Sequence, residues 1–419
     1  MSNLRLDRRV AVIPGACRQW LVIAAMVWLV LMTADKGMKF SAMIYNLLGT
    51  RPANHATGTT TTPQRSTITP QTPGKNEILA ILRKVNSYQL SHPVLDAAEA
   101  ADPLFHPWPR VTWYTGVMAA WEATKDQPFF EQSLAYGREL HWQVSKERVG
   151  PNRLFLIQLL AELYFVMKDR AMIEPSIKWL ATPDPLTPAG SKQWYMDARD
   201  THEPPIPYAD SLYGAPALAM LAKATGDKYY LNIMNAFFDD VTKRLFDEES
   251  GLYYRDPSYI GRRTSNGKKI LWSRGNGWVF AGIPRVLDYL PEREPNRQRY
   301  LNIFRRMAAA LIKRQGADGL WRVNLDDSDQ FPNPETSGSG FFCFGLAWGI
   351  NHGVLSRQEY LPAAEKAWAG LTRNLSPEGK VLWGQLVDSE PNSVARESTH
   401  EFVTGAFMLA GSEVYKLAH

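Results

Sequence analysis

The sequence predicts an all-α fold in which six helical hairpins close into an (α/α)6 barrel, also called a six-hairpin barrel. Three observations support this prediction. From Asn76 onward the spacing of apolar residues is helical almost throughout. Helices that are apolar on nearly every side alternate with amphipathic helices, six of each kind. A short glycine-led motif also recurs through the second half of the chain.

The apolar helices form the predicted inner ring. A helix that is apolar nearly all round must be enclosed, whereas an amphipathic helix can cover it from outside. The predicted inner helices are residues 111–124, 152–167, 210–225, 276–290, 339–355 and 402–417. The predicted outer helices are residues 76–90, 128–145, 169–180, 228–245, 295–315 and 358–373.

The repeated motif marks the joints between the later helices. GLYYRD, GLWRVN and GKVLWGQ begin at Gly251, Gly319 and Gly379. A glycine-containing helix start lies 20 to 26 residues after each of them, so the unit is an outer helix, a short extended segment and an inner helix. Six such pairs without polar terminal caps favour a closed ring over an open solenoid.

The first 75 residues differ in character from the rest. Arginines precede an apolar run at 20–34, which is short for a membrane span and typical of an export signal. An uncleaved signal-anchor is the alternative, with the arginines on the cytoplasmic side. Residues 51–75 are rich in Thr and Pro and are predicted to form a disordered linker.

These features predict three parts: a tail with the signal or anchor (1–50), the linker (51–75) and the barrel (76–419). The barrel is expected in the periplasm or outside the cell, either released or held by a membrane tether through residues 20–34.

Composition argues against several kinds of site. The formal net charge is +5, and the basic residues are scattered, so no nucleic-acid partner is predicted. With only Cys17 and Cys343, a structural disulfide is not expected and a cysteine metal site is excluded. The eight histidines show no metal-binding spacing, so we predict no metal site. The positive balance is compatible with an anionic oligosaccharide as partner, and the oligomeric state stays open.

The candidate site lies at the predicted N-terminal ends of the inner helices. Inner helices of such a ring run in one direction, so these ends share one face, where partial positive charge favours an anion. The segment LWSRGNGW at 271–278 is the most informative, because tryptophan stacks on sugars and arginine holds carboxylates through two hydrogen bonds. Aromatics that merely pack in the core are the alternative. The other residues placed on this face are Trp113, Tyr114, Asp210, 335–340, His400 and Glu401.

Several segments resemble glycoside hydrolase family 105, the unsaturated rhamnogalacturonyl hydrolases and related unsaturated uronyl hydrolases. They are ADSLYGAPALAMLAKATGDKYY (209–230), GLYYRD, WSRGNGWVFAG, PETSGSGFF (334–342), LAWGINHGVL (346–355) and GAFMLAGSEVYKL (405–417). The resemblance covers roughly residues 76–417 and implies the six-hairpin barrel. It also implies an enzyme that hydrates the C4=C5 double bond of a terminal uronic acid left by a polysaccharide lyase, without a metal or organic cofactor.

The resemblance assigns roles to individual residues. Asp210, in PYADSLYGAP, matches the aspartate that donates a proton to C4, and a helix N-cap is its alternative role. Arg274 matches the partner of the substrate carboxylate, with a structural salt bridge as the alternative. Arg255 is a second candidate contact for an anion. The predicted substrate-binding residues are Trp272, Arg274, Trp278, Asn276, Trp113, Tyr114, Arg255 and His400.

The sequence departs from the family at the second inner helix, where many members carry another aspartate. GPNRLFLIQLLAELY offers Asn152 and Arg153 instead, and Asp197, Asp200 or Glu335 are weaker replacements. Two alternatives therefore stay open. One is a conventional inverting glycosidase on the same barrel, with two carboxylates about 6.5–9.5 Å apart. The other is a sugar-binding protein that has lost catalysis.

Overall fold

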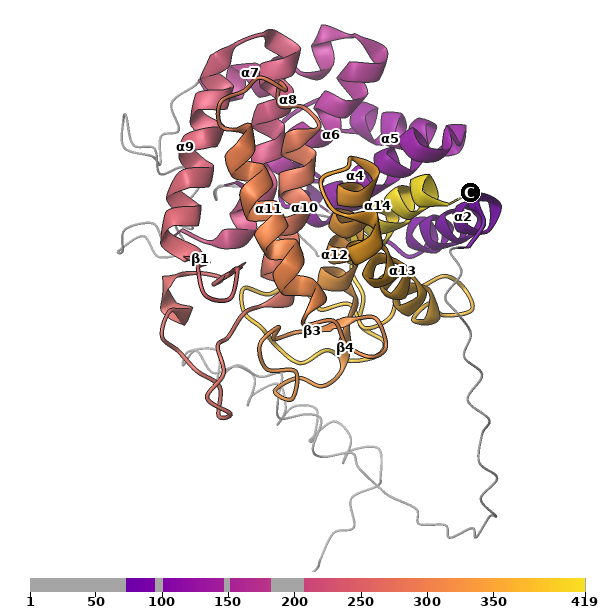
Figure 1. Ribbon diagram of the computed structural model, residues 1–419. Coiled ribbons are helices and arrows are strands. Elements are labelled where there is room, and N and C mark those ends of the chain that lie inside the picture. Colours follow the sequence, from indigo (N-terminus) through magenta and orange to yellow (C-terminus); the bar gives the residue numbers. More distant parts are fainter. Residues whose placement is uncertain (1–72, 95–100, 147–150, 182–206, 419) are drawn as a thin grey trace, which may run out of the picture. The chain divides into compact units, whose positions relative to one another are not determined.

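The computed structural model describes residues 73–94, 101–146, 151–181 and 207–418 (Figure 1). All of them belong to one unit of the chain, Ile68–His419. The predicted export segment and nearly all of the predicted linker lie outside the described residues, so these two predictions and the boundaries at 50 and 75 stay predictions. None of the described helices has the length and apolar character needed to cross a membrane.

The described residues are mostly helical, with twelve α-helices of eight residues or more. The predicted alternation of inner and outer helices is confirmed. The inner helices are α4 (Trp108–Thr124), α6 (Asn152–Met167), α8 (Ala215–Thr225), α10 (Ser273–Leu287), α12 (Thr336–Asn351) and α14 (Glu401–Leu417). The outer helices are α2 (Lys75–Ser91), α5 (Gln127–Glu139), α7 (Glu174–Ala181), α9 (Lys228–Leu245), α11 (Arg297–Ile312) and α13 (Arg357–Arg373).

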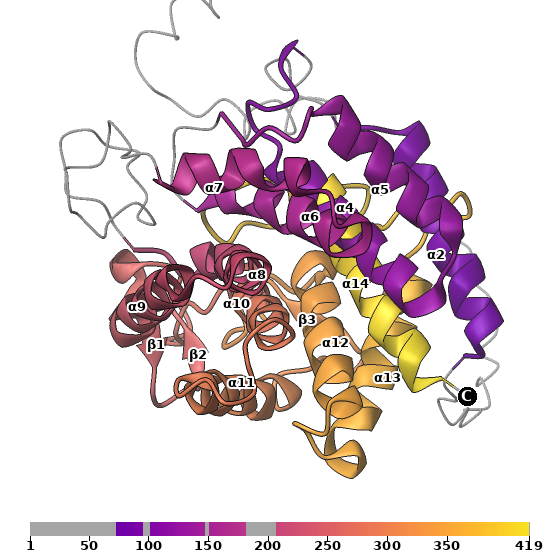
Figure 2. The same ribbon diagram turned by 90° about the horizontal axis from the view of Figure 1, so that it is seen from above.

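The inner helices form a closed ring in the described part of the chain. Each packs against the next in chain order, and α14, the last, packs against α4, the first (Figure 2). The outer helices lie around this ring. Burial follows the pattern expected from the sequence, because all 15 residues of α10 are buried whereas α9 buries only one face.

Two glycines allow α4 and α14 to approach closely where the ring closes. A Cβ atom built on Gly116 would lie 2.5 Å from the carbonyl oxygen of Gly405. A Cβ atom built on Gly405 would lie 2.4 Å from the carbonyl oxygen of Thr112. Any side chain at either position would force the two helices apart.

The repeated motif forms tight turns that join an outer helix to the inner helix that follows it, and each turn packs on the next outer helix. Gly251, Gly319 and Gly379 all have positive φ angles (71°, 91° and 108°), which glycine adopts without steric cost. Each one also faces a backbone carbonyl of an outer helix, namely Arg306 in α11, Lys366 in α13 and Lys84 in α2. The third turn therefore packs on the first outer helix, which closes the outer layer as well.

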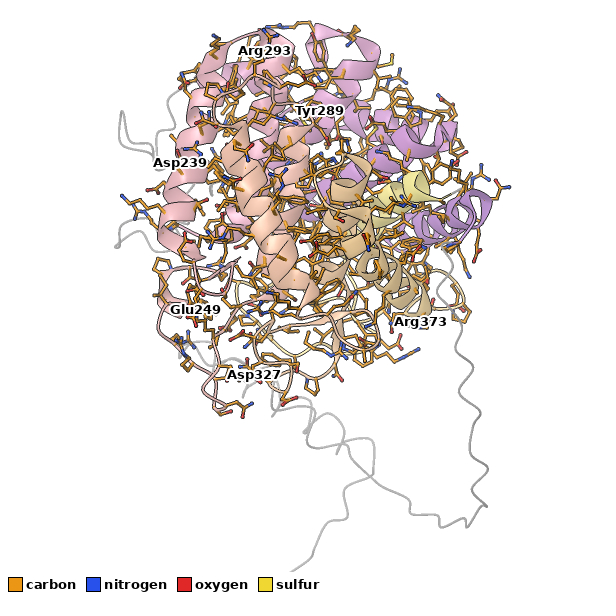
Figure 3. All side chains as sticks on the ribbon, viewed as in Figure 1. Asp239, Glu249, Tyr289, Arg293, Asp327 and Arg373 are labelled. Atoms are coloured by element: carbon orange, nitrogen blue, oxygen red, sulfur yellow. The ribbon has the colours of Figure 1, made fainter. Side chains whose placement is uncertain are left out.

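Short strands flank these turns at one end of the ring. Strand β1 (Phe246–Asp247) pairs with β2 (Leu252–Tyr253), and β3 (Trp321–Arg322) pairs with β4 (Pro334–Glu335), both antiparallel. Figure 1 shows them at the lower end of α10 and α12, where β4 leads directly into α12. Figure 3 places Glu249 and Asp327 at this end and Tyr289 at the opposite end.

The end of the ring near Tyr289 contains a buried ion pair. Arg285 Nη2 donates to Glu162 Oε1 at 2.8 Å, and Arg285 Nε donates to Gln158 Oε1 at 3.0 Å. Burial raises the pKa of Glu162 to about 7, although the charge of Arg285 acts to lower it. This carboxyl group is therefore a source of pH-dependent stability remote from the candidate site.

Replacing Glu162 with glutamine is expected to make thermal stability less dependent on pH. The folded-state pKa exceeds the ordinary value of 4.5, so the folded protein holds this proton more tightly than the unfolded chain does. The resulting stabilisation is complete below about pH 4.5 and is lost as the pH rises through about 7. The Tm should therefore fall less between about pH 5 and about pH 8 in Glu162→Gln than in the wild type. Glu174→Gln, at an exposed ion pair on α7, is the matched control, and equal slopes in all three proteins would contradict this expectation.

Candidate functional site

The N-terminal ends of the inner helices meet at one end of the ring, as predicted. One aromatic ring from the first turns of each inner segment contributes to a shared cluster centred on Trp278. Its ring centroid lies 4.4 Å from Phe341, 4.8 Å from Tyr213 and 5.7 Å from Phe155. Phe402 and Trp108 follow at 5.9 and 6.0 Å. This central aromatic cluster fills the middle of the ring beneath its N-terminal end.

Trp278 lies inside the cluster and is 3% exposed, so a sugar cannot stack on it without rearrangement. Trp108 is the half-buried member and stacks on Phe402 at 5.4 Å. Sequence reasoning missed Trp108 because it started the first inner helix at Val111, one turn too late. The prolines at 107 and 109 were the available signal, since proline favours the first turn of a helix.

Asp210 lies in η3 (Ala209–Gly214), the 3₁₀ turn that leads into α8. The predicted inner helix therefore starts later than expected, and Tyr208 rather than Asp210 occupies the N-cap of the turn. Asp210 Oδ1 lies 3.5 Å from Nε of Arg255, and both side chains are largely buried. An opposite charge at this distance favours a carboxylate in its charged form, which opposes the effect of burial that we expected from the sequence.

Arg255 lies between two carboxylates. Its Nη1 donates to Asp256 Oδ2 at 2.9 Å, while its guanidinium lies 4.9 Å from the ring centre of Tyr208. Burial acts to lower the pKa of Arg255, but the charges of Asp210 and Asp256 raise it above its ordinary value. The backbone helps to set this geometry, because the amide of Ala209 donates to the carbonyl of Arg255 at 2.8 Å. The structure thus brings together Asp210 and Arg255, two residues singled out from the sequence.

Arg274 lies at the start of α10 and is 2% exposed. Its Nη1 donates to the carbonyls of Gln385 (3.1 Å) and Leu386 (2.6 Å), and its Nη2 donates to that of Asp388 (2.8 Å). Burial lowers its pKa to about 10, while the charges of Glu335, Asp210 and Asp388 act to raise it. The predicted structural alternative for Arg274 was a salt bridge, whereas its hydrogen bonds here go to backbone carbonyls of one loop.

Trp272 and Asn276 have structural partners. Trp272 is 1% exposed, packs with Val323 and Val394, and donates from Nε1 to Gln385 Oε1 at 2.8 Å. Asn276 exchanges two hydrogen bonds with the backbone of Tyr253, at 2.8 and 2.9 Å, so it ties α10 to β2. Neither side chain is exposed at the N-terminal end of the ring, where we expected substrate contacts.

Trp113 and Tyr114 lie away from the candidate site. Since α4 starts at Trp108, both belong to its second turn and point toward the outer helices. Trp113 Nε1 donates to Asn86 Oδ1 in α2 at 3.0 Å, and Tyr114 stacks on Tyr136 of α5 at 4.2 Å. Their contacts are therefore with the outer helices, because the helix starts one turn earlier than we expected.

His400 and Glu401 do lie at the start of an inner helix. His400 is the N-cap of α14, where its Nδ1 accepts from the amide of Glu401 at 2.9 Å, and its ring stacks on Phe402 at 5.1 Å. Arg110 Nη2 lies 2.8 Å from Oε1 of the buried Glu401. His400 therefore stands beside the central aromatic cluster, whereas Glu401 pairs with a cation.

Among the described residues, Asp256 is an acid that shares the cation Arg255 with Asp210. Glu335, a weaker replacement, is fully buried and caps α12 by accepting from the amides of Ser337 (2.8 Å) and Gly338 (2.7 Å) and from Ser273 Oγ (3.0 Å). Asn152 is the first residue of α6, and the candidates Asp197 and Asp200 lie outside the described residues. No group of three or more His, Cys, Asp or Glu suited to a metal occurs among the residues that are described.

A family model described as Glycosyl Hydrolase Family 88 matches residues 81–418. An unsaturated 3S-rhamnoglycuronyl hydrolase from Formosa agariphila is 31% identical over 364 residues, which are 82% of this chain and 91% of that protein. A protein of the same name from an Alteromonas species is 40% identical over 208 residues. These residues are 49% of this chain and 50% of the Alteromonas protein, so the match spans about half the length of that relative. A solved structure named a polysaccharide lyase shares 30% identity, covers 82% of this chain and 98% of that chain, and has a TM-score of 0.71.

Proposed function

Since the chain belongs to Glycosyl Hydrolase Family 88, we propose that it removes the unsaturated uronic acid from the non-reducing end of lyase-generated oligosaccharides such as rhamnogalacturonan fragments. The resemblance to unsaturated uronyl hydrolases, stated from sequence motifs, is confirmed by relatives that carry such names. The observation that carries the proposal is the pair of Asp210 and Arg255, 3.5 Å apart, at the N-terminal end of the inner ring. In this arrangement Arg255 can receive the carboxylate of an anionic vinyl ether while Asp210 lies beside it as the proton donor.

In the proposed reaction Asp210 donates a proton to C4 of the double bond. Water adds at C5, and its remaining proton restores Asp210. The resulting hemiketal collapses and releases the rest of the oligosaccharide, with one water consumed. General acid catalysis of this kind contributes about 10²–10⁴-fold to a rate. No second carboxylate is required to displace the glycosidic oxygen, which agrees with the engagement of Glu335 and Glu401 in structural contacts.

Arg255 is the proposed partner of the substrate carboxylate. A uronate carboxylate that reaches this guanidinium competes with Asp210 for the same positive charge, and the competition favours the protonated form of Asp210 that the reaction needs. Arg274 is less suited to this role than the motif suggested, because three of its five N–H groups already donate to loop carbonyls.

We further propose that the two helical layers constitute a six-hairpin (α/α)6 barrel and that residues 20–34 export it from the cytoplasm. The closed inner ring and the closing contact of Gly379 with α2 support the first part. The apolar run and the preceding arginines support the second part.

Incubation with lyase-treated rhamnogalacturonan tests the proposed reaction, because the double bond absorbs ultraviolet light and its hydration abolishes that absorbance. We expect the absorbance to fall with time as free sugar appears. A rise on undigested polymer would instead indicate a lyase, the activity in the name of one structural relative. Cleavage of saturated oligosaccharides without any fall would indicate an inverting glycosidase. Binding of several lyase products without turnover would indicate a sugar-binding protein, the reading favoured by the absence of an aspartate at Asn152.

A further inference from the structure

Asp256 makes contacts through both of its carboxylate oxygens. Its Oδ2 accepts from Arg255 Nη1 at 2.9 Å, and its Oδ1 accepts from the amide of Ser258 at 2.9 Å. The second contact makes Asp256 the N-cap of η4 (Pro257–Tyr259), a 3₁₀ turn. Asp256 is only 7% exposed, so both oxygens are engaged inside the protein.

Capping alone does not account for a charged residue at this position. Asp169 caps η2 (Arg170–Met172), another 3₁₀ turn of three residues, in the same way, since its Oδ1 accepts from the amide of Ala171 at 3.0 Å. Asp169 is exposed, however, and a cap needs only one oxygen, which asparagine supplies as well as aspartate does. The charge and the second oxygen of Asp256 therefore serve its other partner, Arg255.

Arg255 carries the effect of Asp256 to the proposed proton donor. While Asp256 accepts from Nη1, Asp210 Oδ1 lies 3.5 Å from Nε of the same guanidinium. The ring centre of Tyr208 lies 4.9 Å from this guanidinium, and the amide of Ala209 donates to the Arg255 carbonyl at 2.8 Å, so the arrangement is tied to η3. Two carboxylates thus share one buried cation, and the positive charge that acts on either one depends on the other.

The charges around Asp210 give this sharing a consequence. Burial acts to lower the pKa of Arg255, but the charges of Asp210 and Asp256 raise it above its ordinary value. Cations near a carboxyl group favour its charged form, whereas Asp210 must hold a proton in order to donate one, so a carboxylate that offsets the cation assists the donor. The other titratable and charged groups that interact with Arg255, or with Arg274 as a second cation near Asp210, are Tyr208, Tyr259, Glu335 and Asp388.

We propose that Asp256 is a positioning residue that acts on Asp210 through Arg255: it offsets part of the guanidinium charge and so sets the pH range over which Asp210 delivers its proton. Asp256 contacts neither the double bond nor the attacking water in this role. A substitution that neutralises Asp256 leaves Asp210 facing the full charge of Arg255. This inference rests on the proposed function and identifies a further residue on which the reaction depends.

The pH profile of kcat tests this role, because it reports protonation in the enzyme–substrate complex. Initial rates of ultraviolet absorbance loss are measured at saturating lyase-treated rhamnogalacturonan for the wild type and for Asp256→Asn, which keeps the cap and removes the charge. In the variant the alkaline fall in kcat should begin about one pH unit lower, since the guanidinium then favours the charged form of Asp210 more strongly. At a fixed pH on that side, kcat should be about tenfold lower than in the wild type.

Two further variants separate the charge from the cap. Asp256→Glu keeps the charge and should keep the wild-type profile. Asp169→Asn is the matched control for the cap of a 3₁₀ turn and should keep that profile as well. A profile displaced as far in either of these variants as in Asp256→Asn would overturn the inference, because the charge of Asp256 would then not be the cause.

The outcomes also separate this inference from the proposed function. An unchanged pH profile in folded Asp256→Asn would overturn the role of Asp256 while the reaction stands. No loss of absorbance with the wild type would overturn the proposed function itself. If Asp256→Asn does not fold, Asp256→Ser takes its place as a second neutral cap. If neither neutral variant folds while Asp256→Glu does, the charge is needed for folding, and its role in protonation is overturned.

Discussion

Replacing Asp210 with asparagine is expected to reduce kcat about 10³-fold, with the affinity for the unsaturated oligosaccharide changed by only a few-fold. The amide has the shape of the acid but cannot deliver the proton to C4. Its removal from the ion pair leaves Arg255 facing one carboxylate, Asp256, in place of two, so the guanidinium remains available to a uronate. The initial rate of ultraviolet absorbance loss gives kcat, and calorimetric titration of the inactive variant gives the affinity.

Asp239→Asn is the matched control for this substitution. Asp239 lies on the outer helix α9, its side chain is 44% exposed, and it pairs with Arg299 at 2.7 Å (Figure 3). An exposed pair contributes about 0–1 kcal/mol to stability, so activity and Tm should both stay close to the wild type. If Asp210→Asn kept a tenth or more of the wild-type kcat, Asp210 would not be the proton donor.

The helical layers could be predicted from the sequence because burial determines where apolar residues stand. The inner helix α10 needs apolar residues on all sides, whereas α9 needs them on one side, and each requirement leaves a distinct periodicity. The repeated motif was equally informative. Its glycines are required by positive φ angles and by contact with outer-helix carbonyls, two backbone constraints that the three joints at Gly251, Gly319 and Gly379 share.

The directions of side chains within the site could not be predicted from the sequence as the helical layers could. Starting α4 at Val111 in place of Trp108 assigns Trp113 to the first turn of the helix, at the N-terminal end of the ring, whereas it lies in the second turn and donates to Asn86 of α2. Trp272 and Arg274 presented another difficulty. Their partners lie more than 100 residues later, in a loop whose contacts leave no periodic signal in the sequence.

Asp210 and Arg255 could be identified because each lies in or beside a segment that the fold uses for other reasons. Arg255 lies in the GLYYRD turn, and Asp210 precedes the apolar α8. Their ion pair could not be foreseen, since it depends on a backbone hydrogen bond between η3 and the residues after β2. It places beside Asp210 a cation that the expectation based on burial alone did not include.

Replacing Gly405 with alanine is expected to destabilise the protein by about 3 kcal/mol, at the upper end of the usual cost of overpacking. Two effects oppose each other. Alanine is favoured over glycine inside a helix by about 1 kcal/mol. The new methyl carbon, however, would lie 2.4 Å from the carbonyl oxygen of Thr112 and 2.6 Å from its carbonyl carbon, distances that backbone atoms cannot absorb by rotation. The steric cost of the new methyl group therefore exceeds the gain in helix propensity.

The measurement is the Tm by differential scanning calorimetry, with Gly74→Ala as the control. No atom lies within 4 Å of a Cβ built on Gly74, so that change should alter stability by less than about 1 kcal/mol. Because α4 and α14 are the first and last inner helices, separating them opens the ring where it closes, and turnover should fall along with the Tm. If the Gly405→Ala protein were as stable as the wild type, α14 could move outward without loss of stability. Close contact between α4 and α14 would then not be what holds the ring closed.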